Sequence, residues 1–166
     1  MKYDICALGN ALVDTQFMVS YEFLDSVGLE ADQMTLVSAE EQNTITKKLE
    51  ELGIESISDC GGSATNSLVA ASSYGAACHH VCRVSQDDDG VRYLDSLKKA
   101  NVYHKCYSEY ELALPTIKCL ILVTPDAKRT MVSILAVSAY MNANDLDLEA
   151  IANSNTFYIE GYMVTS

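Results

Sequence analysis

Residues 59–67, with the sequence DCGGSATNS, constrain the fold of this chain more than any other stretch. A strand-like run over 54–57 precedes them and a helix-like run over 66–74 follows. Two adjacent glycines let the backbone turn tightly and let a ligand approach the main chain. We therefore expect a strand–turn–helix unit with Ser63 as the N-cap of the helix. The free N–H groups at the start of this helix could bind hydroxyl or anionic oxygens. An ordinary glycine turn is the alternative, because short glycine motifs have many false positives.

A second polar turn lies near the start of the chain. Residues 4–8 form a short apolar run that ends in a Gly-Asn turn at Asn10, which predicts a buried strand with a polar carboxyl end. Residues 13–20 then alternate apolar and polar side chains, the period of a half-exposed strand. Asp14 follows closely after Asn10, and ligands gather at such strand ends in open α/β sheets. We expect a ligand contact here, and Asn66 offers the donor and acceptor that suit sugar hydroxyls.

The order of elements predicts the fold class. Helices are expected over 21–27, 39–52, 66–74, 91–100 and 145–153, and strands over 4–8, 13–20, 33–37, 54–57, 77–84, from 101, 115–123, 128–135 and 157–159. Core strands that alternate with helices indicate a parallel α/β sheet. The strands near 13–20, 33–37 and 116–135 are polar-alternating, which indicates a separate, one-sided sheet.

Composition narrows the function classes. A chain of 166 residues corresponds to one domain, and its net charge of −12 argues against nucleic acid and anionic membranes as partners. No apolar run approaches the roughly 20 residues of a transmembrane helix, and Asp4 stands where the apolar part of a signal peptide would begin. Six scattered cysteines suggest reduced thiols. We expect a cytoplasmic protein without a nucleic-acid or membrane partner.

Three features have a structural as well as a functional interpretation. Residues 78–82, CHHVC, could bind a metal, but a strand places alternate side chains on opposite faces, so core and surface residues are the better account and no metal is expected. The acidic run 87–89 could bind a cation, but a solvated turn before a helix at 91 is favoured. Arg129 is either an exposed hairpin arginine or a phosphate contact.

Four short motifs together resemble the PfkB family of ribokinase-like sugar and nucleoside kinases. They are residues 9–14 (GNALVD), 61–66 (GGSATN), 124–131 (TPDAKRTM) and 158–162 (YIEGY), in order and at fitting separations. The nearest resemblance is to the adenosine-kinase-like branch. It covers nearly the whole chain and implies a Rossmann-like, mainly parallel sheet flanked by helices, with a small β-sheet lid. Residues 1–166 would then be the N-terminal portion of a kinase domain whose C-terminal half is missing.

The resemblance also implies roles for individual residues. The implied substrate-binding residues are Asn10, Asp14, Gly61, Gly62 and Asn66, and the implied phosphate contact is Arg129. The first two would grip sugar hydroxyls and the next three would line the same pocket. The implied reaction transfers the γ-phosphate of ATP to a primary hydroxyl of a sugar or nucleoside, with Mg²⁺, through positioning and charge neutralisation. Most residues that bind ATP and Mg²⁺ would lie outside this chain.

The sequence also departs from the family pattern. The family's catalytic aspartate lies in a Gly-Ala-Gly-Asp motif beyond the point where this sequence stops, so no catalytic residue and no kinase activity are expected in this chain alone. Cys82, Ile117 and Ala136 stand where the family usually has glycine. The alternative is a binding or interaction module that never catalyses. Exposed lid strands or an exposed sheet edge could pair with a second copy, which gives a homo-oligomer. The sequence does not distinguish a nucleoside from a simple sugar.

Overall fold

The computed structural model describes residues 2–107 and 114–164. The chain divides into two compact units. We call Met1–Leu12, Cys60–Ile117 and Ala136–Ser166 the α/β unit, and Val13–Asp59 with Lys118–Leu135 the β-sheet unit. Each is described by itself.

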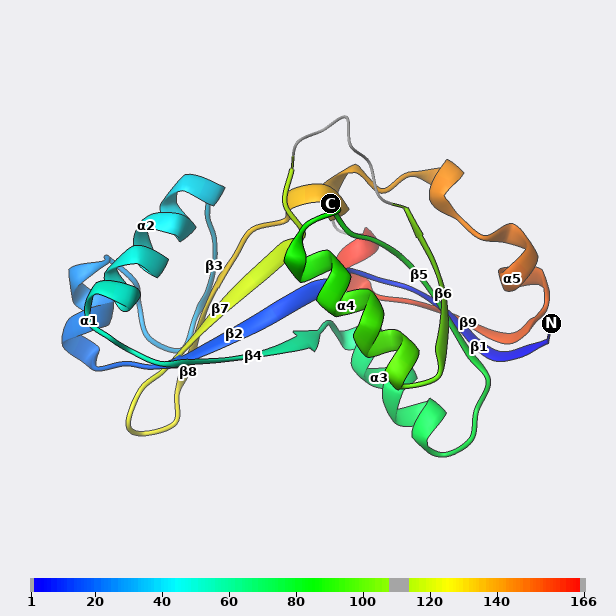
Figure 1. The fold of residues 1–166 in the computed structure, drawn as a ribbon, viewed down its shortest axis with the longest axis horizontal. Coiled ribbons are helices and arrows are strands. Elements are labelled where there is room, and N and C mark those ends of the chain that lie inside the picture. Colours follow the sequence, from blue (N-terminus) through cyan, green and yellow to red (C-terminus); the bar gives the residue numbers. More distant parts are fainter. Residues whose placement is uncertain (1, 108–113, 165–166) are drawn as a thin grey trace. The chain divides into compact units, whose positions relative to one another are not determined.

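The α/β unit is built on a parallel sheet. Its strands are β1 (Tyr3–Leu8), β5 (Cys78–Arg83), β6 (Val102–Tyr107) and β9 (Ser154–Ile159), in the order β6-β5-β1-β9. Every neighbouring pair is parallel. Helices α3 (Ser63–Ser73) and α4 (Asp88–Lys99) cover one face, and α5 (Leu148–Ala152) packs on the other (Figure 1). The predicted parallel α/β sheet is thus confirmed.

Strand β5 is buried on both faces, so the prediction that residues 78–82 divide into core and surface is wrong. His80 and Cys82 share a face with the core under α3 and α4, whereas Val81 packs with Cys6 and α5. Central strands of parallel sheets are covered on both sides and read as nearly continuous buried runs. The histidines therefore lie in the interior, not at the surface.

The β-sheet unit contains most of a second, mixed sheet. Its strands are β2 (Leu12–Met18), β3 (Met34–Leu36), β4 (Ser56–Gly61), β7 (Ile117–Val123) and β8 (Arg129–Ser133), in the order β3-β8-β7-β2-β4. Strands β7 and β8 form the predicted antiparallel hairpin, and β3 joins β8 in parallel. Helices α1 (Tyr21–Ser26) and α2 (Ala39–Glu51) share a core with them. Along β2 the buried side chains alternate with partly or fully exposed ones, as predicted.

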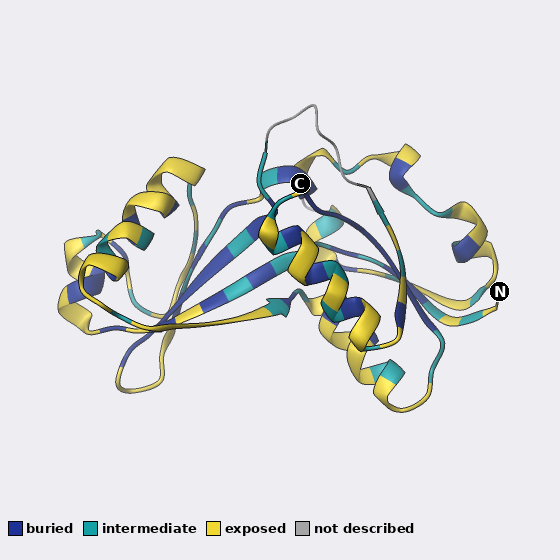
Figure 2. Ribbon diagram, viewed as in Figure 1, coloured by how far each residue is buried: buried dark blue, intermediate teal, exposed yellow. Residues whose placement is uncertain are grey.

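The helix starts show where local sequence decides the structure. Helix α2 begins with a capping box: the Glu41 amide donates to the Ser38 hydroxyl over 3.2 Å, and the Ser38 amide donates to the Glu41 carboxylate over 2.8 Å. Helix α4, however, begins at Asp88, three residues before the predicted Val91, because Asp87 is its N-cap. Figure 2 shows buried and exposed residues alternating along α4.

The predicted helix over 145–153 is shorter than expected. A 3₁₀ turn, η2 (Ala143–Asp145), comes first, and α5 then begins after its N-cap Asp147. Further 3₁₀ turns are η1 (Ala136–Tyr140) and η3 (Gly161–Val164). Over 2–107 and 114–164, no helix is both long and apolar enough to cross a membrane.

Candidate functional site

The glycine pair joins a strand directly to a helix. Gly61 ends β4, and Gly62 is the N-cap of α3 with φ of 107° and without a side-chain cap. The prediction of Ser63 as the N-cap is wrong, since Ser63 is already the first helical residue. A φ of this size is open in practice only to glycine. The backbone requirement at Gly62 therefore decides where the helix begins.

Gly62 also lies against the first polar turn. A Cβ atom at Gly62 would stand 2.6 Å from the carbonyl oxygen of Asn10, closer than any side chain allows. The amide of Asn66 donates to the Gly62 carbonyl over 2.9 Å. Asn10 is half-buried and Asn66 is exposed. The structure thus brings Asn10, Gly61, Gly62 and Asn66 together in the α/β unit.

A buried carboxylate holds the Asn10 turn. The Asn10 amide donates to Oε2 of Glu160 over 2.8 Å, and Glu160 is 2 % exposed. The same oxygen would stand 2.4 Å from a Cβ atom at Gly9, so this position has no room for a side chain. Glu160 follows β9, the neighbour of β1. Sequence reasoning noted the motif around Glu160 but missed this contact; its place just after a strand that could pair with β1 was the available signal.

A buried hydrogen-bonded chain supports the first turn of α3. The hydroxyl groups of Thr65 and Tyr93 are 2.5 Å apart, and Nδ1 of His80 is 3.2 Å from the Tyr93 hydroxyl. Burial lowers the pKa of His80 to about 3, so its imidazole is neutral. These three residues come from α3, α4 and β5, and no local pattern in the sequence indicates that they meet.

Asp14 and Arg129 interact electrostatically within the β-sheet unit. Burial raises the pKa of the Asp14 carboxyl, the positive charge of Arg129 opposes that rise, and Asp59 adds to it. A hydrogen bond with the Cys119 thiol also lowers the Asp14 pKa. Asp14 is half-buried on β2 and Arg129 is exposed at the start of β8. A carboxylate beside a guanidinium can accept hydroxyl hydrogens while the arginine contacts phosphate oxygens.

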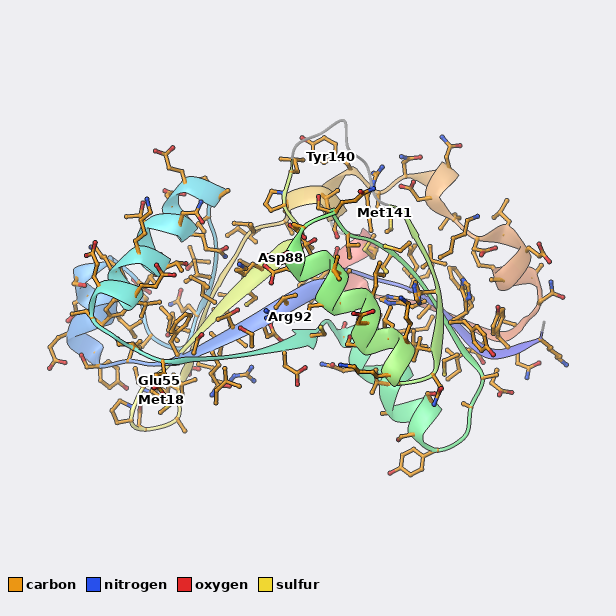
Figure 3. All side chains as sticks on the ribbon, in the orientation of Figure 1. Met18, Glu55, Asp88, Arg92, Tyr140 and Met141 are labelled. Carbon is orange, nitrogen blue, oxygen red and sulfur yellow. The ribbon has the colours of Figure 1, made fainter. Side chains whose placement is uncertain are left out.

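The acidic run 87–89 has a structural role. The Asp87 carboxylate accepts from the Gly90 amide at 2.8 Å and from the amide and hydroxyl of Thr116 at 2.8 and 2.6 Å. Asp88 is exposed on the first turn of α4 (Figure 3). Within the described ranges, no group of three or more His, Cys, Asp or Glu side chains could hold a metal ion. The predicted solvated turn is therefore a helix cap tied to a distant residue.

The candidate site residues fall into two groups. Those in the α/β unit are Asn10, Gly61, Gly62 and Asn66, and those in the β-sheet unit are Asp14 and Arg129. Their contacts to a substrate stay predictions.

Comparisons with known proteins show the family and the fold of the chain. A family model described as pfkB family carbohydrate kinase matches residues 25–166. A probable sugar kinase from Rhizobium etli CFN 42 has the same fold, with a TM-score of 0.87 and 23 % identity, over 99 % of this chain and 48 % of that one. The adenosine kinase from Sinorhizobium meliloti matches with a TM-score of 0.81 and 25 % identity, over 99 % of this chain and 49 % of that one.

A third solved structure carries a ligand. The adenosine kinase from Schistosoma mansoni in complex with 2-fluoroadenosine has a TM-score of 0.86 and 17 % identity, over 99 % of this chain and 48 % of that one. The chain thus spans about half the length of these structures.

Proposed function

We propose that this chain, which belongs to the pfkB family of carbohydrate kinases, is the substrate-binding and lid portion of an ATP-dependent kinase. The kinase would transfer a phosphoryl group to a primary hydroxyl of a nucleoside or sugar. In this proposal Asn10, Gly61, Gly62 and Asn66 belong to the α/β unit, and the lid strands belong to the β-sheet unit.

The observation that carries this proposal is the close approach of Gly62 to Asn10. A glycine without a side-chain cap, pressed against a polar turn, leaves main-chain groups open to a ligand. Glu160 fixes the Asn10 turn, and the Thr65–Tyr93–His80 chain fixes the first turn of α3. Rigid support of this kind lowers the ordering cost of binding.

We assign the following roles to the side chains. Asp14, Asn10 and Asn66 bind the substrate hydroxyls, and Arg129 contacts the phosphoryl group and offsets its negative charge. ATP with Mg²⁺ supplies the phosphoryl group, and such catalysis rests on positioning and charge neutralisation. The carboxylate that accepts the hydroxyl proton is not one of the four residues to which we assign these roles.

A nucleoside is the favoured substrate. Two of the similar structures are adenosine kinases, and one of them holds 2-fluoroadenosine. We place the protein in the cytoplasm, since no disulfide links the described cysteines and a reducing compartment keeps thiols in that state.

Calorimetric titration of the full chain with adenosine and with ribose tests the proposal. We expect adenosine to bind, and Asp14→Asn to weaken its binding by about 1–3 kcal/mol, roughly 5-fold to 150-fold, because the lost charge leaves hydroxyls poorly paired. Asp25→Asn, an exposed aspartate of α1, is the matched control and should bind as the wild type does. Equal dissociation constants for both variants would remove Asp14 from the site, and binding of ribose alone would make the substrate a simple sugar.

The second candidate is a ligand-binding module without catalysis. The observation that favours it is Ala136, which stands where the family usually has glycine and keeps a φ of 43°. The left-handed backbone conformation costs an alanine roughly 1–2 kcal/mol of conformational free energy. The chain therefore keeps the backbone conformation that suits glycine, although glycine itself is absent. The two candidates differ in one measurement: phosphorylation of bound adenosine by ATP in the full-length gene product supports the kinase, and binding without turnover supports the module.

A further inference from the structure

Two cysteines face each other across neighbouring strands of the α/β unit. Cys82 on β5 and Cys106 on β6 are register partners in a parallel pair. Both pack on the core under α3 and α4, where Cys82 is completely buried and Cys106 is half-buried. Neighbouring strands lie about 4.8 Å apart, and disulfides join Cα atoms roughly 4.4–6.8 Å apart. The backbone therefore holds the two Cα atoms at a separation that a disulfide can span.

The two thiols are chemically unequal. A hydrogen bond from the Cys82 thiol lowers the pKa of Cys106, and burial opposes that effect. The Val84 amide and the positive charge of Arg83 lower the pKa of Cys106 further. The hydrogen bond to Cys106, together with burial, raises the pKa of Cys82 well above its usual value. A thiol of lowered pKa beside a thiol of raised pKa is the arrangement of an attacking and a resolving cysteine.

Cys6, Cys78 and Cys119 lack this pair of unequal thiols. Burial raises the pKa of the Cys6, Cys78 and Cys119 thiols. In the sheet register, Cys6 pairs with His79, and Cys78 pairs with Val102 and Ile5. Buried thiols of this kind are inert.

We propose that Cys82 and Cys106 form a redox-active dithiol that closes to a disulfide when the protein meets hydrogen peroxide. The Cys106 sulfur attacks one peroxide oxygen, which gives a sulfenic acid and one water. The Cys82 sulfur then attacks the sulfenic sulfur, which forms the S–S bond and releases a second water. Two thiols are oxidised by two electrons and one peroxide is reduced to two waters.

The disulfide would lie next to Tyr93. This residue packs in the same core as Cys82, and its pKa is raised first by burial and further by negative charge at Cys82 or Cys106. Because the Tyr93 hydroxyl contacts Thr65 on the first turn of α3, the dithiol stands one side chain away from the proposed substrate loop.

Treatment of the full chain with peroxide, followed by alkylation and tryptic mapping, tests this inference. We expect one cross-linked peptide pair containing Cys82 and Cys106, loss of two alkylatable thiols, and full recovery with dithiothreitol. Cys106→Ser should abolish the cross-link, and Cys82→Ser should leave a Cys106 that oxidises to sulfenic and then sulfinic acid. Cys60→Ser is the matched control, because Cys60 is half-buried on the same core. This variant should form the Cys82–Cys106 disulfide as the wild type does.

Two outcomes would overturn the inference. One is a wild-type protein in which Cys82 and Cys106 stay alkylatable after peroxide. The other is a cross-link that joins Cys60 to either of them. Both are read on the wild-type chain, so they decide the question even where a serine variant fails to fold.

Discussion

Asp87 does more for the α/β unit than its place in an acidic run suggests. Burial alone would raise the pKa of its carboxyl, but the hydrogen bonds from Thr116 and Gly90 outweigh that effect and the pKa is lowered. The Thr116 hydroxyl oxygen in turn accepts a hydrogen bond from the Ser85 amide over 3.0 Å. The Asp87 carboxylate thus orders the backbone at Gly90, at Thr116 and, through Thr116, at Ser85. The Asp87 side chain therefore joins the start of α4 to the residue before β7.

We expect Asp87→Asn to lower the free energy of unfolding by about 1–3 kcal/mol at neutral pH, since an amide cannot replace every accepted bond of the charged group. A folded-state pKa below the unfolded one adds stability that is present above the unfolded pKa and is lost as the pH falls through the folded pKa. Urea unfolding between neutral and acid pH measures this.

The Asp87→Asn difference from the wild type should shrink in acid, where the wild-type carboxyl is itself protonated. Asp88→Asn, one residue along and exposed, is the control and should change stability little at any pH (Figure 3). A loss for Asp87→Asn that stayed constant down to low pH would show that charge has no part in the effect.

Asp14 illustrates the opposite balance. Its pKa is raised because burial of the carboxylate outweighs the attraction of Arg129. Ionisation of Asp14 therefore opposes folding, which is the balance expected of the substrate contact that we propose.

At the scale of elements, local chemistry was enough for some features. The α2 capping box, the β7–β8 hairpin and the alternation along β2 depend on residues close together in the sequence, and all were predictable. The start of α4 was not, because Asp87 is fixed by Thr116, 29 residues away. The burial of β5 on both faces likewise depends on helices from distant parts of the chain.

The candidate site divides in the same way. Turn chemistry marked Asn10, Gly61 and Gly62 in the sequence, since polar and glycine residues after a strand are a local signal. Glu160 contacts Asn10, which is 150 residues away in the sequence. The sequences of β1 and β9 do not predict that these two strands are neighbours in the sheet. Interior hydrogen bonds such as that between Thr65 and Tyr93 depend on how α3 and α4 pack, so they cannot be predicted from the local sequence.

The α3 N-cap gives a sharp test at the element scale. Gly62→Ala should lower the free energy of unfolding by about 2–4 kcal/mol, because a strained φ and a clash with the Asn10 carbonyl act together. Gly28→Ala is the matched control: its φ is +70° but the space around it is open, so strain of roughly 1 kcal/mol acts alone. Denaturant unfolding compares the two, and equal losses would mean that the contact with Asn10 yields without cost.

At the scale of the whole molecule, β9 leaves one edge of the parallel sheet open among the described strands. Phe157 and Ile159 on this strand are 36 and 43 % exposed, and Tyr162 and Val164 beyond it are more exposed still. Unpaired strand edges beside apolar side chains associate with other chains. This edge, more than the mixed sheet, is therefore the surface through which we expect copies of the chain to meet.

We predict that the 166-residue chain self-associates in solution in a concentration-dependent way. Ile159→Lys should shift the equilibrium towards monomer, because a charged side chain blocks edge pairing. Tyr74→Lys, an exposed aromatic after α3, is the control and should leave association unchanged. Light scattering over a range of concentrations measures it, and a wild-type monomer at every concentration would contradict the prediction.

Buried Tyr93 also has a spectroscopic consequence. The chain has no tryptophan and ten tyrosines, so its near-ultraviolet absorption comes almost wholly from phenol rings. Burial raises the pKa of Tyr93 well above the usual tyrosine value, so this ring stays un-ionised at a pH that ionises an ordinary phenol. The last phenolate to absorb in an alkaline titration would then come from the centre of the α/β core, and its appearance would mark the opening of that core without any added dye.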